Sequence, residues 1–179
     1  MGQLNSTIQK AGKSPKPWWI SCVFPHGESP NERTAGGSKV QIDDLLEATF
    51  GVEVFGFGVI SSFPSPSGFG INCTLVKYIA PLTAKLRKYM QRAKLDNSQL
   101  WLILYPNGNY TYDEATRSRR EPQTCDEMGW AEEVGATVQE AEESTTRIFG
   151  GIVVGGCCKT TPKDIAALQY ILDSKWSKT

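Results

Sequence analysis

Three of the five cysteines in this sequence follow apolar runs that predict buried strands. Cys73 ends the run 68–73, and the adjacent pair Cys157 and Cys158 follows the run 146–154. In α/β proteins with parallel sheets, the carboxyl ends of the strands form the edge that carries the site. Three thiolates meeting at that edge suit zinc, which takes three protein ligands and keeps one open position in catalytic sites. The residues leave two interpretations open: a sulfur-rich metal centre, or thiols that fill core space.

Glycines and cysteine spacing bear on this choice. Gly155 and Gly156 precede the cysteine pair and allow the backbone to approach a site closely, which favours the metal interpretation. Neighbouring cysteines rarely bridge each other, so we expect both members of the pair to be reduced. Cys22 lies inside the apolar run 18–24 and is expected to fill core space. Cys125 lies in a polar stretch and is expected to be an incidental free thiol.

The other polar groups have less support from the pattern. The single histidine, His26, lies in a Gly- and Pro-rich loop and is expected to be solvated. Asn72, beside Cys73, is a candidate for a hydrogen bond within the site. Glu28 and Asp113 are possible pocket residues. We interpret one cluster of basic residues, flanked by glutamates, as a solvated face: Arg117, Arg119 and Arg120.

Apolar runs and helical stripes alternate along the chain. Strands are predicted at 18–24, 68–73, 99–105 and 146–154, and helices at 40–50, 77–92, about 130–141 and 162–172. This order implies a parallel sheet with covering helices. The run 99–105 has the pattern of a strand buried on both faces, and the polar stretch 111–125 is expected to be mostly loop.

Composition excludes several classes of protein. The chain has 179 residues, with 19 Lys and Arg against 19 Asp and Glu. Because no basic excess neutralises phosphates, a dedicated nucleic-acid binder is not expected. No run of about 18 apolar residues predicts a membrane span. The amino-terminal residues lack a signal-peptide pattern, so a cytoplasmic location is expected.

Two separated motifs resemble those of the homocysteine S-methyltransferase family. They are Gly70-Ile71-Asn72-Cys73-Thr74 and, further along, Gly155-Gly156-Cys157-Cys158 with the residues up to Pro162. In that family a G-x-N-C segment and a G-G-C-C segment supply three zinc-binding cysteines. The resemblance therefore implies one zinc ion per chain, bound by Cys73, Cys157 and Cys158.

The same resemblance implies a fold. Family domains are (β/α)8 barrels of the TIM type, which need about 250 residues, whereas four β/α units are predicted here. The segments 18–24 and 104–108 resemble the family's fifth strand and its strand before the last helix pair, and the segment 61–67 resembles an extended form in fungal members. We expect a flexible segment 1–16 and a homocysteine-binding domain, a partial barrel of strands five to eight, over 17–174.

The implied reaction moves a methyl group from S-methylmethionine or S-adenosylmethionine to homocysteine, which forms methionine. Two alternatives remain. In the first, the chain is an inactive, truncated zinc-binding remnant of the family. In the second, it is an open α/β redox protein, but the C-x-x-C pattern expected of that class is missing. A partial barrel has open sheet edges, so self-association through them is also expected.

Overall fold

A central parallel sheet carries the fold. The computed structural model describes residues 16–50, 65–93, 100–108, 111–113, 118–120, 127–143 and 148–176. The four strands lie in chain order across the sheet: β1 (Trp19–Val23), β2 (Gly68–Asn72), β3 (Trp101–Tyr105) and β6 (Gly151–Val154). Every neighbouring pair is parallel. The predicted α/β class with a parallel sheet is confirmed.

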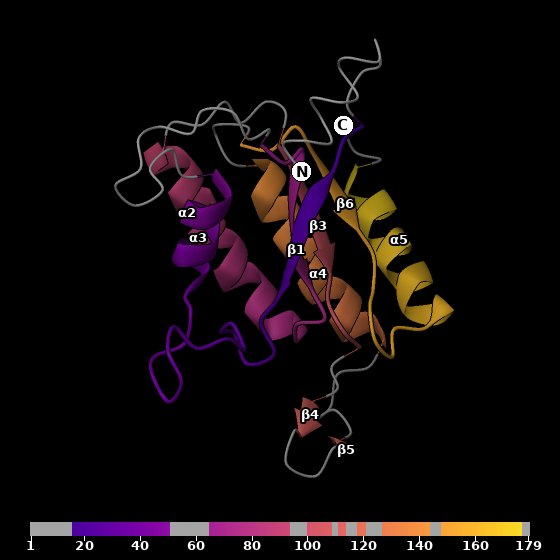
Figure 1. Cartoon of the computed structure of the whole chain (residues 1–179). Helices are drawn as coiled ribbons and strands as arrows, with labels where there is room; N and C mark the ends of the chain where they lie inside the picture. Colours follow the sequence, from indigo (N-terminus) through magenta and orange to yellow (C-terminus); the bar gives the residue numbers. More distant parts are fainter. Residues whose placement is uncertain are drawn as a thin grey trace.

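Each strand of the sheet is followed by a helix. These helices are α2 (Ile42–Phe50), α3 (Ile79–Ala93) after the short 3-10 helix η1 (Val76–Tyr78), α4 (Glu127–Glu143) and α5 (Pro162–Trp176). Connections between parallel strands are almost always right-handed. Because the strand order never reverses, such connections place all helices on one face. In Figure 1, α4 lies behind the strands, with α3 on one side and α5 on the other.

The core lies between the sheet and this row of helices. Alternate residues of the strands point toward the helices, as the two-residue period of a strand requires. Phe69, Ile71, Leu102 and Leu104 are fully buried there. They pack in one cluster with apolar residues of α2, α3 and α4, among them Leu46, Leu86 and Val138. The apolar runs of the sequence are explained by this burial.

The opposite face of the sheet, which we call the open face, keeps large apolar groups exposed. Trp19, Trp101 and Val153 are 57%, 46% and 49% exposed. No element in the described part of the chain covers them. The prediction that the third strand is buried on both faces is therefore only partly right. Ile103 on the open face is buried, but Trp101 at the start of that strand is not.

Two sequence-based boundaries differ from the structure for reasons of pairing. The stretch predicted to be mostly loop contains a small antiparallel hairpin of β4 (Thr111–Asp113) and β5 (Ser118–Arg120). These strands are too short to show a hydrophobic period. Of the strand predicted at 146–154, residues 146 and 147 lie outside the described residues, and the strand begins at Gly151, where it pairs with Trp101, the first residue of β3. Among the described residues, no helix is long and apolar enough to cross a lipid bilayer.

One polar contact crosses the open face near the carboxyl ends of the strands. The hydroxyl of Tyr105 on β3 donates a hydrogen bond to Oγ of Ser21 on β1, at 2.5 Å. The strand between them, β2, contributes Gly70, which pairs with Ser21. A Cβ atom at Gly70 would overlap the Ser21 hydroxyl and lie 3.0 Å from its Cβ. Because Gly70 has no side chain, the Ser21 hydroxyl has the space it needs to bond to Tyr105.

We predict that Gly70→Ala lowers the free energy of unfolding by about 1–3 kcal/mol, because overpacking forces the Ser21 side chain away. Gly155→Ala is the matched control, since a Cβ there meets nothing within 4 Å. Urea unfolding followed by circular dichroism measures both variants. Equal stability of the two variants would contradict the assignment of tight packing to Gly70.

Candidate metal centre

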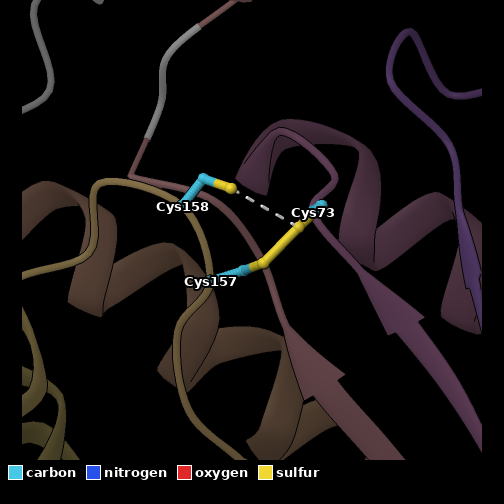
Figure 2. A group of neighbouring side chains, drawn as sticks. All are labelled: Cys73, Cys157 and Cys158. Carbon is cyan, nitrogen blue, oxygen red and sulfur yellow. Dashed lines mark hydrogen bonds between the residues drawn. A yellow bond between two sulfur atoms is a disulfide. The ribbon is translucent and has the colours of Figure 1, made fainter.

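Three cysteine side chains converge at the carboxyl edge of the sheet. Cys73 directly follows β2, and Cys157 and Cys158 follow β6. Their Sγ atoms all lie within 4.8 Å of one another, and Figure 2 shows the three side chains pointing toward one point. In the described part of the chain, this is the one group of three or more His, Cys, Asp or Glu side chains close enough to share a metal ion. The sequence-predicted site residues thus come together.

The end of β3 gathers these cysteines from both sides. Strands two positions apart lie about 9.6 Å from each other, yet the Cα atoms of Cys73 and Cys157 are 5.5 Å apart. The N–H of Cys73 donates to the carbonyl of Tyr105, at 3.1 Å, and the N–H of Cys157 donates to the carbonyl of Pro106, at 2.8 Å. Two successive carbonyls of the middle strand therefore draw the flanking chains over its end.

Cys73 itself has an unusual backbone conformation. Its φ of 47° lies in the left-handed region, which non-glycine residues seldom adopt. The next residue, Thr74, is fully buried. Its Oγ1 accepts a hydrogen bond from the N–H of Phe24 and donates one to the carbonyl of Asn72, each at 3.0 Å. Such outliers persist only where neighbouring contacts hold them, and they cluster at functional sites.

The segment with the cysteine pair is equally closely packed. The N–H of Gly108 donates to the carbonyl of Cys158, at 2.9 Å, and the N–H of Thr160 donates to the carbonyl of Cys157, at 3.1 Å. A Cβ atom at Gly156 would overlap the Thr160 side chain. The expected role of glycine before the pair, close approach of the backbone, is therefore seen at Gly156 but not at Gly155, which faces open space.

Helix α5 begins shortly after the cysteine pair and is firmly capped. Both the N–H and the Oγ1 of Thr161 donate to Oδ2 of Asp164, each at 2.7 Å. Pro162 takes the first helical position, where its missing N–H has no cost. The cap thus fixes the point, shortly after the cysteine pair, at which α5 begins.

The structure contains a disulfide between Cys73 and Cys157, while Cys158 is a free, exposed thiol. The expectation that both members of the pair are reduced is wrong for Cys157. That expectation considered only a bridge within the pair, whereas the convergence of two strand ends supplies a distant partner. Figure 2 shows this bridge beside Cys158.

The distance between the sulfurs of Cys73 and Cys158 suits two ligands of a tetrahedral metal ion. Zn–S bonds of about 2.3 Å separate two sulfur ligands by about 3.8 Å, and the Sγ atoms of Cys73 and Cys158 are 3.8 Å apart. A bound metal would need Cys73 and Cys157 as separate thiolates. Disulfide and metal are therefore mutually exclusive states of the same three residues, and the donor set is compatible with a soft metal such as zinc once reduced.

The remaining candidates fall outside this cluster. Cys22 packs against the core, and burial raises the pKa of its thiol, so its interpretation as a core residue is confirmed. His26 and Glu28 are exposed in the loop after β1. The Oδ1 atom of Asn72 is buried and has no hydrogen-bond partner among the described residues. Three of the candidates lie on the hairpin: Asp113, Arg119 and Arg120. Two lie outside the described residues: Arg117 and Cys125.

The sequence alone indicates no role for Thr74, although this residue belongs to the first cysteine motif. A signal was present in the chain. Threonine hydroxyls often bond to nearby backbone groups where regular structure ends, and Thr74 follows the end of a predicted strand. The distant partner, the N–H of Phe24, could not be read from the sequence because it depends on the pairing of β1 with β2.

Fold and site together define an α/β protein with a cluster of three cysteines at the carboxyl edge of a parallel sheet. A model of the homocysteine S-methyltransferase family matches residues 3–172, and the chain belongs to this family. The predicted resemblance to this family is thereby confirmed.

Individual relatives are similar over part of the chain. A selenocysteine methyltransferase of Astragalus bisulcatus is 31% identical over 112 residues, which are 62% of this chain and 28% of that protein. Homocysteine S-methyltransferase YbgG of Bacillus subtilis is 31% identical over 99 residues, 55% of this chain and 25% of the relative. Homocysteine S-methyltransferase 3 of Arabidopsis thaliana is 27% identical over 119 residues, 65% and 29% of the two chains.

The matched part of the chain thus spans less than a third of the length of these relatives. No solved structure is significantly similar to the chain.

We predict that protein kept without reductant links Cys73 to Cys157 and leaves Cys158 open to alkylation. Trypsin cleavage after Lys39, Lys77, Arg147 and Lys159 yields the peptides 40–77, with Cys73, and 148–159, with the cysteine pair. Mass spectrometry should find these peptides joined, with the alkyl group on Cys158. A bridge within 148–159, or two separate alkylated peptides, would contradict this pairing.

Proposed function

We propose that this chain carries the zinc-binding part of a homocysteine S-methyltransferase. In this proposal Cys73, Cys157 and Cys158 bind one zinc ion, and a methyl group moves from S-methylmethionine or S-adenosylmethionine to homocysteine, which forms methionine. The observation that carries the proposal is the convergence of three cysteine sulfur atoms, all within 4.8 Å of one another, at the carboxyl edge of the sheet in a member of this family.

The chemistry follows from the donor set. A free thiol has a pKa of about 8.5, and the thiolate is the nucleophile. Cys73, Cys157 and Cys158 would hold the zinc ion, which would supply Lewis acidity that favours the thiolate form of the substrate at neutral pH. Three thiolates and a doubly charged cation would give the centre one net negative charge. This charge would help to keep the substrate sulfur electron-rich and would attract a positively charged sulfonium donor.

The chain's own residues orient and shape this centre. Tyr105 and Pro106 fix the backbone positions of Cys73 and Cys157 through their carbonyls. A side-chain general base would not be needed, because the metal would lower the pKa of the substrate thiol enough for its proton to pass to water. His26, which is exposed in the loop after β1, is given no role in this proposal. In the proposed transfer, the donor sulfur would leave with the electron pair of its C–S bond, and the homocysteine sulfur would form the new bond to the methyl carbon.

We further propose that the sheet represents four consecutive units, strands five to eight, of a (β/α)8 barrel. Its strand order, without reversal, and its helices on one face support this assignment. The open face would then be part of the barrel interior, and the outer edges of β1 and β6 would pair with further strands or, in this chain alone, with other copies. The groups that hold the amino acid end of homocysteine would come from the other units.

Serine substitutions test the metal ligands. We predict that reduced protein binds one zinc ion per chain and that Cys73→Ser, Cys157→Ser and Cys158→Ser each lower the zinc content well below one, because a hydroxyl is a poor ligand for a soft site. Cys22→Ser is the control, since this residue packs against the core. Elemental analysis after dialysis measures zinc. Undiminished zinc in the Cys157→Ser and Cys158→Ser variants would refute the assignment.

Joining the chain to the preceding units of a relative tests the reaction. We predict that the fusion methylates homocysteine, whereas the chain alone shows no detectable turnover. Correct orientation of reactants can lower a reaction barrier by about 7–11 kcal/mol, and the orienting groups would be missing from the chain alone. Methionine formation is measured with each sulfonium donor in turn.

The fusion with Cys158→Ser is the matched control and should be inactive. Turnover by the isolated chain would show that its four units suffice. A folded, zinc-loaded but inactive fusion would instead support the alternative of a metal-binding remnant without activity.

A further inference from the structure

The left-handed backbone conformation of Cys73 must be held by contacts with neighbouring residues. For a residue with a Cβ atom, this region is less favourable than the right-handed one, because the Cβ atom lies close to the following carbonyl oxygen. With a φ of 47°, Cys73 makes the turn that ends β2 and brings its Sγ within 3.8 Å of Cys158. On one side its N–H is fixed by the carbonyl of Tyr105. On the carboxyl side of Cys73, the contacts are made by the next residue, Thr74.

Thr74 joins the ends of three neighbouring strands. Its hydroxyl accepts from the N–H of Phe24, directly after β1, and donates to the carbonyl of Asn72, the last residue of β2. Its backbone carbonyl accepts from the N–H of Asn107, just after β3, at 3.0 Å. Phe24 and Thr74 are both 0% exposed. Water therefore does not compete for these bonds, and the loss of the hydroxyl would leave the Phe24 N–H buried without this acceptor.

The hydroxyl bond to Asn72 is the contact that bears on Cys73. It connects residue 74 to the carbonyl of residue 72 and so closes a small ring whose middle member is Cys73. Such a ring restricts the dihedral angles of the enclosed residue. The buried bond to Phe24 then anchors the ring to the edge strand β1.

We propose that Thr74 is a positioning residue for Cys73: its hydroxyl holds Cys73 in the left-handed conformation that directs the thiol toward Cys157 and Cys158. The inference rests on the proposed function, because it concerns how a metal ligand is held. Outer contacts that orient metal ligands typically contribute 10–100-fold to metal affinity.

Cobalt titration of the reduced full chain tests this proposal, with Co²⁺ alone as the probe. Co²⁺ bound by thiolates has a sulfur-to-metal absorption that reports the number and arrangement of its ligands. We expect Thr74→Ala to weaken Co²⁺ binding by about 10–100-fold and to reduce this absorption. Thr74→Ser differs from Thr74→Ala by the hydroxyl alone and should bind Co²⁺ like the unchanged protein.

Thr83→Ala is the matched control, because it removes a buried threonine hydroxyl that has no partner among the described residues. It should leave the Co²⁺ affinity and spectrum unchanged. Urea unfolding of the metal-free variants shows which of them are folded under the conditions of the titration.

The outcomes separate the two proposals. No cobalt–thiolate absorption in the unchanged, reduced chain would overturn the proposed function. Binding by the unchanged chain with equal affinity in folded Thr74→Ala would overturn only the role of Thr74. If Thr74→Ala does not fold, Thr74→Ser decides: wild-type affinity and spectrum support the hydroxyl as the positioning group, and a folded Thr74→Ser with tenfold weaker binding overturns it.

Discussion

Two successive carbonyl groups at the end of β3 determine the geometry of the cysteine cluster. Strands β2 and β6 are not neighbours, and parallel pairing alone would keep the residues that follow them apart. Tyr105 accepts the N–H of Cys73 on one side, and Pro106 accepts the N–H of Cys157 on the other. Because Pro106 has no N–H, it cannot donate a hydrogen bond to a neighbouring strand, and the regular pairing of β3 ends there. The flanking chains close over its end instead, and the thiols meet there.

This arrangement explains what the sequence could and could not predict. Apolar runs are local, and they located all four strands of the sheet, since residues such as Leu102 and Leu104 must be buried wherever the neighbours lie. The convergence of the cysteines followed from a general property of parallel sheets. The exposure of Trp101 and the bridge between Cys73 and Cys157 could not be predicted, because both depend on which segments cover or approach a position after folding.

The hairpin of β4 and β5 shows the same limit at a smaller scale. Three-residue strands carry too few positions for a period, and only their mutual pairing defines them. The backbone of Cys73 is a further example. Nothing in its residue type indicates a positive φ, which arises from hydrogen bonds to Tyr105 and through Thr74. The sequence therefore predicts which side chains could bind a metal, but it does not predict the contacts that orient them.

All three sulfurs of the cluster come from an uninterrupted stretch, from β2 through β3 to the segment after β6. The backbone bonds that gather them, and the threonine that follows Cys73, lie in the same stretch. Two further contacts come from the region of β1: Ser21 bonds to Tyr105, and Phe24, directly after β1, bonds to Thr74. A single exchange of the gene segment that encodes residues 68–160 would therefore transfer the whole donor set together with the backbone bonds that gather it.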